Sequence, residues 1–183
     1  MASVGPNNPT SGTDDNAVGT VTWADPGNII TSDDADATAT IATGDAITHY
    51  LKALFDFSAI PADATSIDGI QADIERMYQI GTGSTHDESV KLIVGGVVVG
   101  DEKAIVGDWP TADAYATYGG AADLWGLAPS VAEVRAADFG VVLSAHITKG
   151  SVIPGNRVAY VDHIRITVTY TAAAVASQVI QCN

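Results

Sequence analysis

Histidine and cysteine side chains are the residues of this chain best suited to nucleophilic or metal chemistry. There are four histidines and one cysteine: His49, His86, His146, His163 and Cys182. His146 and His163 fall at outward positions of two predicted strands, so they could be cross-strand neighbours. A zinc site needs further ligands at a characteristic spacing, and the sequence shows none. A lone cysteine cannot form an intrachain disulfide. We therefore expect structural histidines, with no catalytic residue, metal or cofactor.

Carboxylates are the second group that could carry chemistry. Asp33, Asp34 and Asp36 stand close together, and calcium takes oxygen ligands of this kind. They lack the spacing of a calcium-binding EF-hand loop, which ends in a glutamate. A polar loop whose aspartates cap backbone N–H groups is the simpler interpretation. A glycosidase would need two carboxylates about 5–10 Å apart, and this remains an alternative because acidic residues are plentiful.

Aromatic side chains form the third candidate. The segment 104–127 contains four large rings and the pair Gly119-Gly120; the rings are Trp109, Tyr115, Tyr118 and Trp125. Such a segment is either a long connection whose rings pack on the edge of the fold or an exposed platform on which sugars stack. We expect packing. If the protein binds a glycan, these four rings are the predicted contacts.

Composition limits the possible partners. The chain has 183 residues, 46% of them hydrophobic and 16% charged, with a formal net charge of −14. An acidic surface repels phosphate backbones and anionic lipids, so we expect no nucleic acid and no membrane as partners. No apolar segment is long enough to span a membrane, and the N-terminus has no signal-peptide pattern. These features predict cytoplasmic synthesis.

Alternation of apolar and polar residues identifies the elements that must position these groups. Leu51, Ala53, Phe55 and Phe57 alternate with mostly polar residues, and the alternation resumes over 70–75. A period of two indicates half-buried strands, and we expect these two segments to be neighbours in an antiparallel sheet. Further strands are predicted near 90–99, as a hairpin through Gly95-Gly96, and at 139–148 and 163–170.

These strands predict an all-β fold, an antiparallel β-sandwich with one short helix near 131–137. The helix is indicated by Ser130 and Glu133, which have the spacing of a capping box. Residues 79–88 are expected to form a loop. We predict a β-sandwich domain over 21–171, between a flexible N-terminal arm (1–20) and a C-terminal tail (172–183). Either end could order against a neighbouring subunit.

Several motifs, taken together, resemble virion proteins of tailed bacteriophages of the β-sandwich type. They extend over about Val21–Tyr170: Trp23 with Asp25-Pro26, Ser32-Asp33-Asp34, YLKALFDFSAIPADATSIDGI from Tyr50, Tyr118-Gly119-Gly120, DLWG from Asp123, DFGV from Asp138, and the closing VDHIRITVTY. The resemblance implies a jelly-roll-like sandwich and a place in the virion. It also implies a homo-oligomer, with a trimer favoured, that contacts other virion subunits as a capsid decoration, head-fibre or tail-associated module.

Three functions follow for comparison. The first is a non-enzymatic structural virion protein that acts through subunit contacts, which is the one we expect. The second is a carbohydrate-binding adhesion module that uses the aromatic segment. The third is a glycosidase.

Overall fold

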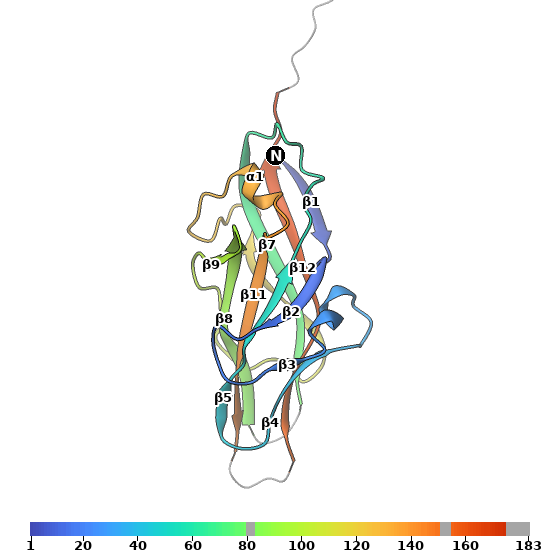
Figure 1. Ribbon diagram of the computed structural model, residues 1–183, viewed down its shortest axis with the longest axis vertical. Coiled ribbons are helices and arrows are strands. Elements are labelled where there is room, and N and C mark those ends of the chain that lie inside the picture. The colour runs from blue at the N-terminus through green and yellow to red at the C-terminus, as the bar shows by residue number, and fades with distance from the viewer. Residues whose placement is uncertain (80–82, 151–154, 175–183) are drawn as a thin grey trace, which may run out of the picture.

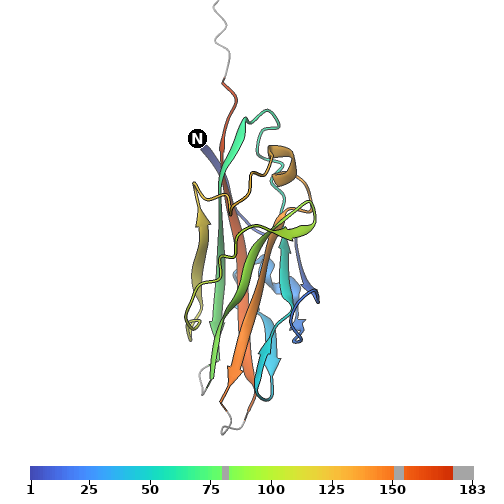
Figure 2. The ribbon, with the colours of Figure 1, turned by 90° about the vertical axis from the view of Figure 1, so that its left-hand side faces the viewer.

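The computed structural model describes residues 1–79, 83–150 and 155–174. Figures 1 and 2 show an elongated molecule whose longest strands run along its long axis in two layers. Within these ranges, every pairing between two strands is antiparallel, and one isolated bridge, between Val21 and Thr48, is parallel. The predicted all-β sandwich is therefore confirmed.

Each layer is a sheet with strands that are distant in sequence. Sheet A runs in the order β10 (Ala114–Gly120), β7 (Ser66–Tyr78), β12 (Arg157–Thr171), β4 (Ala37–Ile41), β3 (Trp23–Ala24), with β1 (Ala2–Asn7) also on β12. Sheet B runs β2 (Ser11–Asp15), β6 (Tyr50–Leu54), β11 (Gly140–Lys149), β8 (Gly83–Val94), β9 (Val97–Val99), with β5 (Asp45–Ile47) also on β11. The described part of the chain also contains two short helices, η1 (Pro26–Ile30) and α1 (Val131–Val134).

The core lies between the sheets and follows the predicted alternation. Alternate residues of β11 and β12 are fully buried, with a one-residue shift of the pattern in β12 between Val161 and His163; among them are Val141, Leu143, Ile164, Ile166 and Val168. Burial of each such side chain contributes about 1.5–3 kcal/mol. The intervening residues of β12 point to the outer face, as the sequence indicated. Alternation alone therefore located the two central strands.

The predicted pairing of the two segments around residue 60 is wrong. β6 belongs to sheet B and β7 to sheet A, so the chain crosses from one layer to the other between them. Phe55, Phe57 and Ile60 are fully buried along this crossing, and the Phe57 and Phe139 rings meet edge to face at 5.8 Å. The apolar residues from Leu51 to Ile60 are therefore of two kinds: some belong to strand β6, and the rest belong to the segment that crosses the core from sheet B to sheet A.

The N-terminal twenty residues differ from the expected arm. β1 pairs with residues 166–170 of β12, and β2 pairs with β6. Val18 then packs on a small apolar cluster of Tyr50, Ile93 and Val142 on the outer side of sheet B. This segment has few apolar residues, but the free edges of β12 and β6 supply backbone hydrogen-bond partners that no periodicity reveals.

Short motifs of neighbouring residues predicted local structure more reliably than the alternation predicted which strands pair. Glu133 N–H donates to Ser130 Oγ (3.2 Å), and Ser130 N–H donates to Glu133 Oε2 (2.8 Å), so the capping box is confirmed. Gly95 and Gly96 have φ of 60° and 74° in the β8–β9 hairpin, as a two-residue turn requires. β8 begins at Gly83, inside the segment 79–88 that was predicted as a loop, and β10 lies inside the predicted connection 104–127.

The C-terminal tail that was predicted over 172–183 is described only in part. Residues 172–174 are not in a strand, and the rest of the predicted tail, including Cys182, lies outside the described residues. Over the described ranges, no helix is long and apolar enough to cross a membrane.

Candidate functional site

The four rings proposed for glycan contact do not form an exposed row. Trp109, Tyr118 and Trp125 are at most 2% exposed, and only Tyr115 reaches the surface, at 37%. Three of the rings are therefore packed, as we expected, and of the four predicted glycan contacts Tyr115 alone is exposed. Large apolar surfaces are buried when their polar edges find partners, and each of these three rings does.

Asp87 is the partner that holds two of the rings. Trp109 Nε1 and the Tyr118 hydroxyl both donate to its carboxylate at 2.8 Å, and the Ile105 N–H donates at 2.9 Å. Arg76 Nε lies 3.4 Å from Asp87 and 3.0 Å from the Tyr118 oxygen. Burial and the Asp87 charge raise the pKa of Tyr118. The group is structural, because it is enclosed inside the sandwich.

Tyr115 lies on the outer face of sheet A in a network of polar groups. The Arg165 guanidinium lies 4.1 Å from the centre of its ring, and its hydroxyl lies 2.8 Å from His163 Nδ1. Arg165 also pairs with Asp73 at 3.2 Å, next to Glu75 on the same strand face. Burial, then the Arg165 charge, lowers the pKa of His163. We call these five residues the Tyr115 face.

The calcium candidates join further acids instead of forming a metal-ligand set. Asp34 and Asp36 lie near Asp113, Asp162 and Glu75, and the Asp33 N–H donates to Asp162 at 3.4 Å. Burial, followed by the charges of Asp113 and Asp162, raises the pKa of Asp36 to about 6. The pKa of Asp113 and the pKa of Asp162 are also raised, first by burial.

A histidine cluster that was not predicted from the sequence lies on the outer face of sheet B. His146 pairs with His86 across β11 and β8, and not with His163, which lies in sheet A. The ligand atoms of His86, Glu88 and His146 all lie within 4.8 Å of one another, the one such grouping of three or more potential metal ligands in the described part of the chain. The sequence pattern H-x-E at 86–88 is the one local signal of this cluster, and it indicates a ligand pair only if the segment is a strand and not the loop predicted for 79–88.

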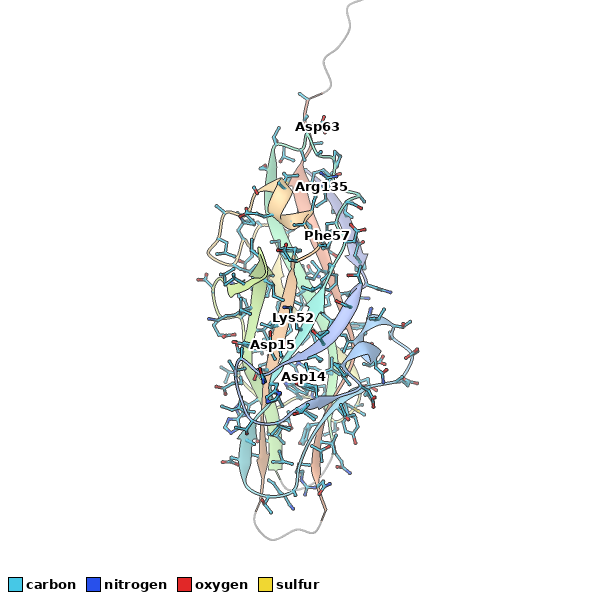
Figure 3. The ribbon with its side chains drawn as sticks, viewed as in Figure 1. Asp14, Asp15, Lys52, Phe57, Asp63 and Arg135 are labelled. Atoms are coloured by element: carbon cyan, nitrogen blue, oxygen red, sulfur yellow. The ribbon has the colours of Figure 1, made fainter. Side chains whose placement is uncertain are left out.

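His49 belongs to a different polar hollow. Its Nδ1 lies 2.8 Å from Asp14 Oδ2, while Asp14 Oδ1 accepts the Trp23 N–H at 2.8 Å. Figure 3 shows Asp14, Asp15 and Lys52 close together on β2 and β6. The Asp14 carboxylate thus joins the start of β3 to the start of β6, which suits a structural role.

An apolar hollow lies beside the edge strand β9. It is lined by Val94, Val97, Val99, Leu127, Ala128 and Pro129, with Glu133 at its margin. Val97 is 59% exposed although it is aliphatic. Farther along the same sheet edge, where the Lys103 N–H donates to the Val90 carbonyl at 3.0 Å, the exposed residues Ile105 and Val106 follow. We call the six lining residues the β9 patch.

Comparisons with known proteins give low similarities. No protein-family model matches the chain, and no curated protein sequence matches it. Among solved structures, the carbohydrate-binding module TmCBM61 in complex with beta-1,4-galactotriose has a TM-score of 0.39 at 8% identity, over 85% of each chain. The enzymatically active domain of bacteriophage CBA120 tailspike protein 4 has a TM-score of 0.35 at 16% identity, over 92% of this chain and 20% of that one. Both neighbours are rich in β-structure. Similarities this low assign no function to this chain.

Proposed function

We propose that this chain is a non-catalytic structural subunit of a phage-like particle that works through contacts between copies of itself. The observation that carries the proposal is the β9 patch. A sheet edge with exposed aliphatic residues is an association site unless it is covered. The motif resemblance to β-sandwich virion proteins supports the same role, and a trimer is the expected assembly.

The chemistry of the patch favours a second copy as the occupant. Like-charged copies with a net charge of −14 repel one another, so stable association needs a contact region without carboxylates. The β9 patch comes close to this requirement, because its six residues are all apolar and Glu133 is the one carboxylate among the described residues that line the hollow. Burial of apolar area then provides about 25 cal/mol per Å².

Sedimentation velocity of the purified protein and of Val97→Asp tests this proposal. The wild type should sediment as an oligomer at micromolar concentration, and the variant should shift toward monomer, because an aspartate would be buried unpaired in the contact. Ala112→Asp adds the same charge to an exposed loop before β10 and should leave the assembly unchanged. A wild-type monomer at all concentrations, or equal dissociation in both variants, would refute a contact through the β9 patch.

Carbohydrate binding is the second candidate, and the Tyr115 face is the observation that favours it. An exposed part of one ring lies among Arg165, Asp73 and Glu75, whose charged groups can hydrogen-bond sugar hydroxyls. A glycan array with the wild type and Tyr115→Ala tests this function. Binding that is lost in the variant supports it, and an array without any bound glycan eliminates it.

A further inference from the structure

We propose that His86, Glu88 and His146 form a binding site for a divalent transition-metal ion of the zinc class. The ligand atoms of all three side chains already lie within 4.8 Å of one another on the outer face of sheet B. The proposal is independent of the subunit contact proposed above, because the β9 patch does not include these residues.

The strand register brings the three side chains together. His86 and His146 are direct cross-strand partners, and their ring centres are 4.8 Å apart. The ladder then shifts between Ser144 and Ala145, so Glu88 has no partner on β11. Its carboxylate instead lies 3.8 Å from His146 Nδ1. A β-bulge of this kind redirects a side chain, here toward the two imidazoles.

The donor atoms select the class of metal. Imidazole nitrogens with one carboxylate suit zinc, copper, nickel or cobalt, whereas calcium and magnesium prefer oxygen ligands alone. Bonds of about 2.1 Å in tetrahedral geometry place ligand atoms about 3.4 Å apart. The side chains must therefore move by about 1 Å. His146 and Glu88 can do so, since their side chains are 29% and 40% exposed.

A simple ion pair accounts poorly for this geometry. At 3.8 Å, the approach of Glu88 to His146 is longer than a hydrogen bond, and exposed ion pairs contribute about 0–1 kcal/mol. Two adjacent imidazoles would also repel each other if both were protonated. A metal ion would instead bind all three groups, and with three protein ligands it would keep one position open to solvent.

Isothermal titration with Zn²⁺, together with the visible absorption of Co²⁺, tests the site on the full-length protein. We expect one tightly bound ion per chain, and a Co²⁺ spectrum typical of tetrahedral coordination. His86→Ala and His146→Ala should each weaken Zn²⁺ binding by about 100-fold or more, and the conservative Glu88→Gln by about 10-fold. Ca²⁺ should not bind at this site.

His49→Gln is the matched control, because His49 is a histidine near the same sheet that already pairs with Asp14. Its affinity for Zn²⁺ should equal that of the wild type, and a loss as large as in His146→Ala would overturn the proposal by placing the ion at Asp14 and His49. Histidine side-chain NMR of the unmodified protein gives a second readout that does not depend on the folding of a variant. Zn²⁺ should shift the His86 and His146 signals only. Absence of Zn²⁺ binding, or unchanged affinity in all three variants, would also overturn the proposal.

Discussion

At the scale of single residues, Asp87 organises the aromatic interior. Its two oxygens accept from Trp109, Tyr118 and the Ile105 backbone, and Arg76 lies beside them. All of these neighbours are donors, so a carboxylate satisfies the site and an amide does not. This residue could not be identified from the sequence, because it lies in a segment that reads as a polar loop.

Asp87→Asn should therefore destabilise the fold by about 3–5 kcal/mol, since the amide would turn an N–H toward a donor and leave the Arg76 charge buried without its partner. For a domain of this size, that corresponds to a fall in Tm of about 10 °C. Thermal denaturation followed by circular dichroism measures it. Glu88→Gln, the next position along the strand but exposed, should stay within about 0.5 kcal/mol of the wild type. Equal Tm values for Asp87→Asn and the wild type would contradict the role given to Asp87.

The Asp36 carboxylate makes the stability of the fold depend on pH. Its folded pKa is about 6, above the ordinary 3.8. The folded state therefore binds the proton more tightly, and this group destabilises the fold at pH above 6. The penalty is relieved as pH falls from 6 toward 3.8.

Asp36→Asn should accordingly raise the free energy of unfolding at pH 7.5 by about 1 kcal/mol, a value reduced for solvent screening. The difference from the wild type should shrink toward zero near pH 4. Urea denaturation at several pH values measures it, and Asp63→Asn in the exposed turn at the tip of the molecule is the control (Figure 3). A variant less stable than the wild type at pH 7.5 would show that the carboxylate is a net stabilising group.

Among the secondary-structure elements, the sequence predicted strands that bury one face in the core. It did not predict strands that are held mainly by backbone hydrogen bonds. Alternation located β11 and β12, and the Gly95-Gly96 and Ser130–Glu133 signals located a hairpin and a helix start. The pairing of β6 with β7 was wrong, because period two reports which residues are buried and not which sheet they join. β1 was missed because Ala2–Asn7 buries little and pairs through its backbone. The histidine cluster was also not predicted, because His86 and His146 meet only through the register of β8 against β11, which alternation does not reveal.

Deletion of residues 1–7 tests whether β1 is part of the fold. It would remove the backbone partners of residues 166–170 and the partly buried Val4. At about 1 kcal/mol for each hydrogen bond, we expect Tm to fall by about 5 °C or more, with faster amide exchange in that part of β12. Ser3→Ala, which changes an exposed side chain but not the backbone, should exchange like the wild type. If the amides of residues 166–170 exchange at the same rate after the deletion, residues 1–7 do not stabilise β12 and are a free arm instead.

At the scale of the whole molecule, charge and apolar surface act against each other. Acidic residues outnumber basic ones 22 to 8, so every contact between copies is opposed by long-range repulsion. The β9 patch offers short-range attraction that does not depend on ions. Salt weakens the charge repulsion but not the apolar attraction. The direction in which salt changes the dissociation constant of the oligomer therefore shows whether the contact is apolar or ionic.

Raising NaCl from 0.1 M to 1 M shortens the screening length from about 10 Å to about 3 Å. Repulsion between the acidic copies is then screened while apolar burial is kept, so the dissociation constant of the oligomer should fall, by about tenfold or more. Sedimentation equilibrium at the two concentrations measures it. Val97→Asp should remain mainly monomeric at both salt concentrations, because screening does not restore the apolar attraction that its contact has lost. An oligomer that instead dissociates as salt rises would require ion pairs between subunits. The interface would then not be the β9 patch, but a surface where cations such as Arg165 pair with carboxylates of a neighbouring copy.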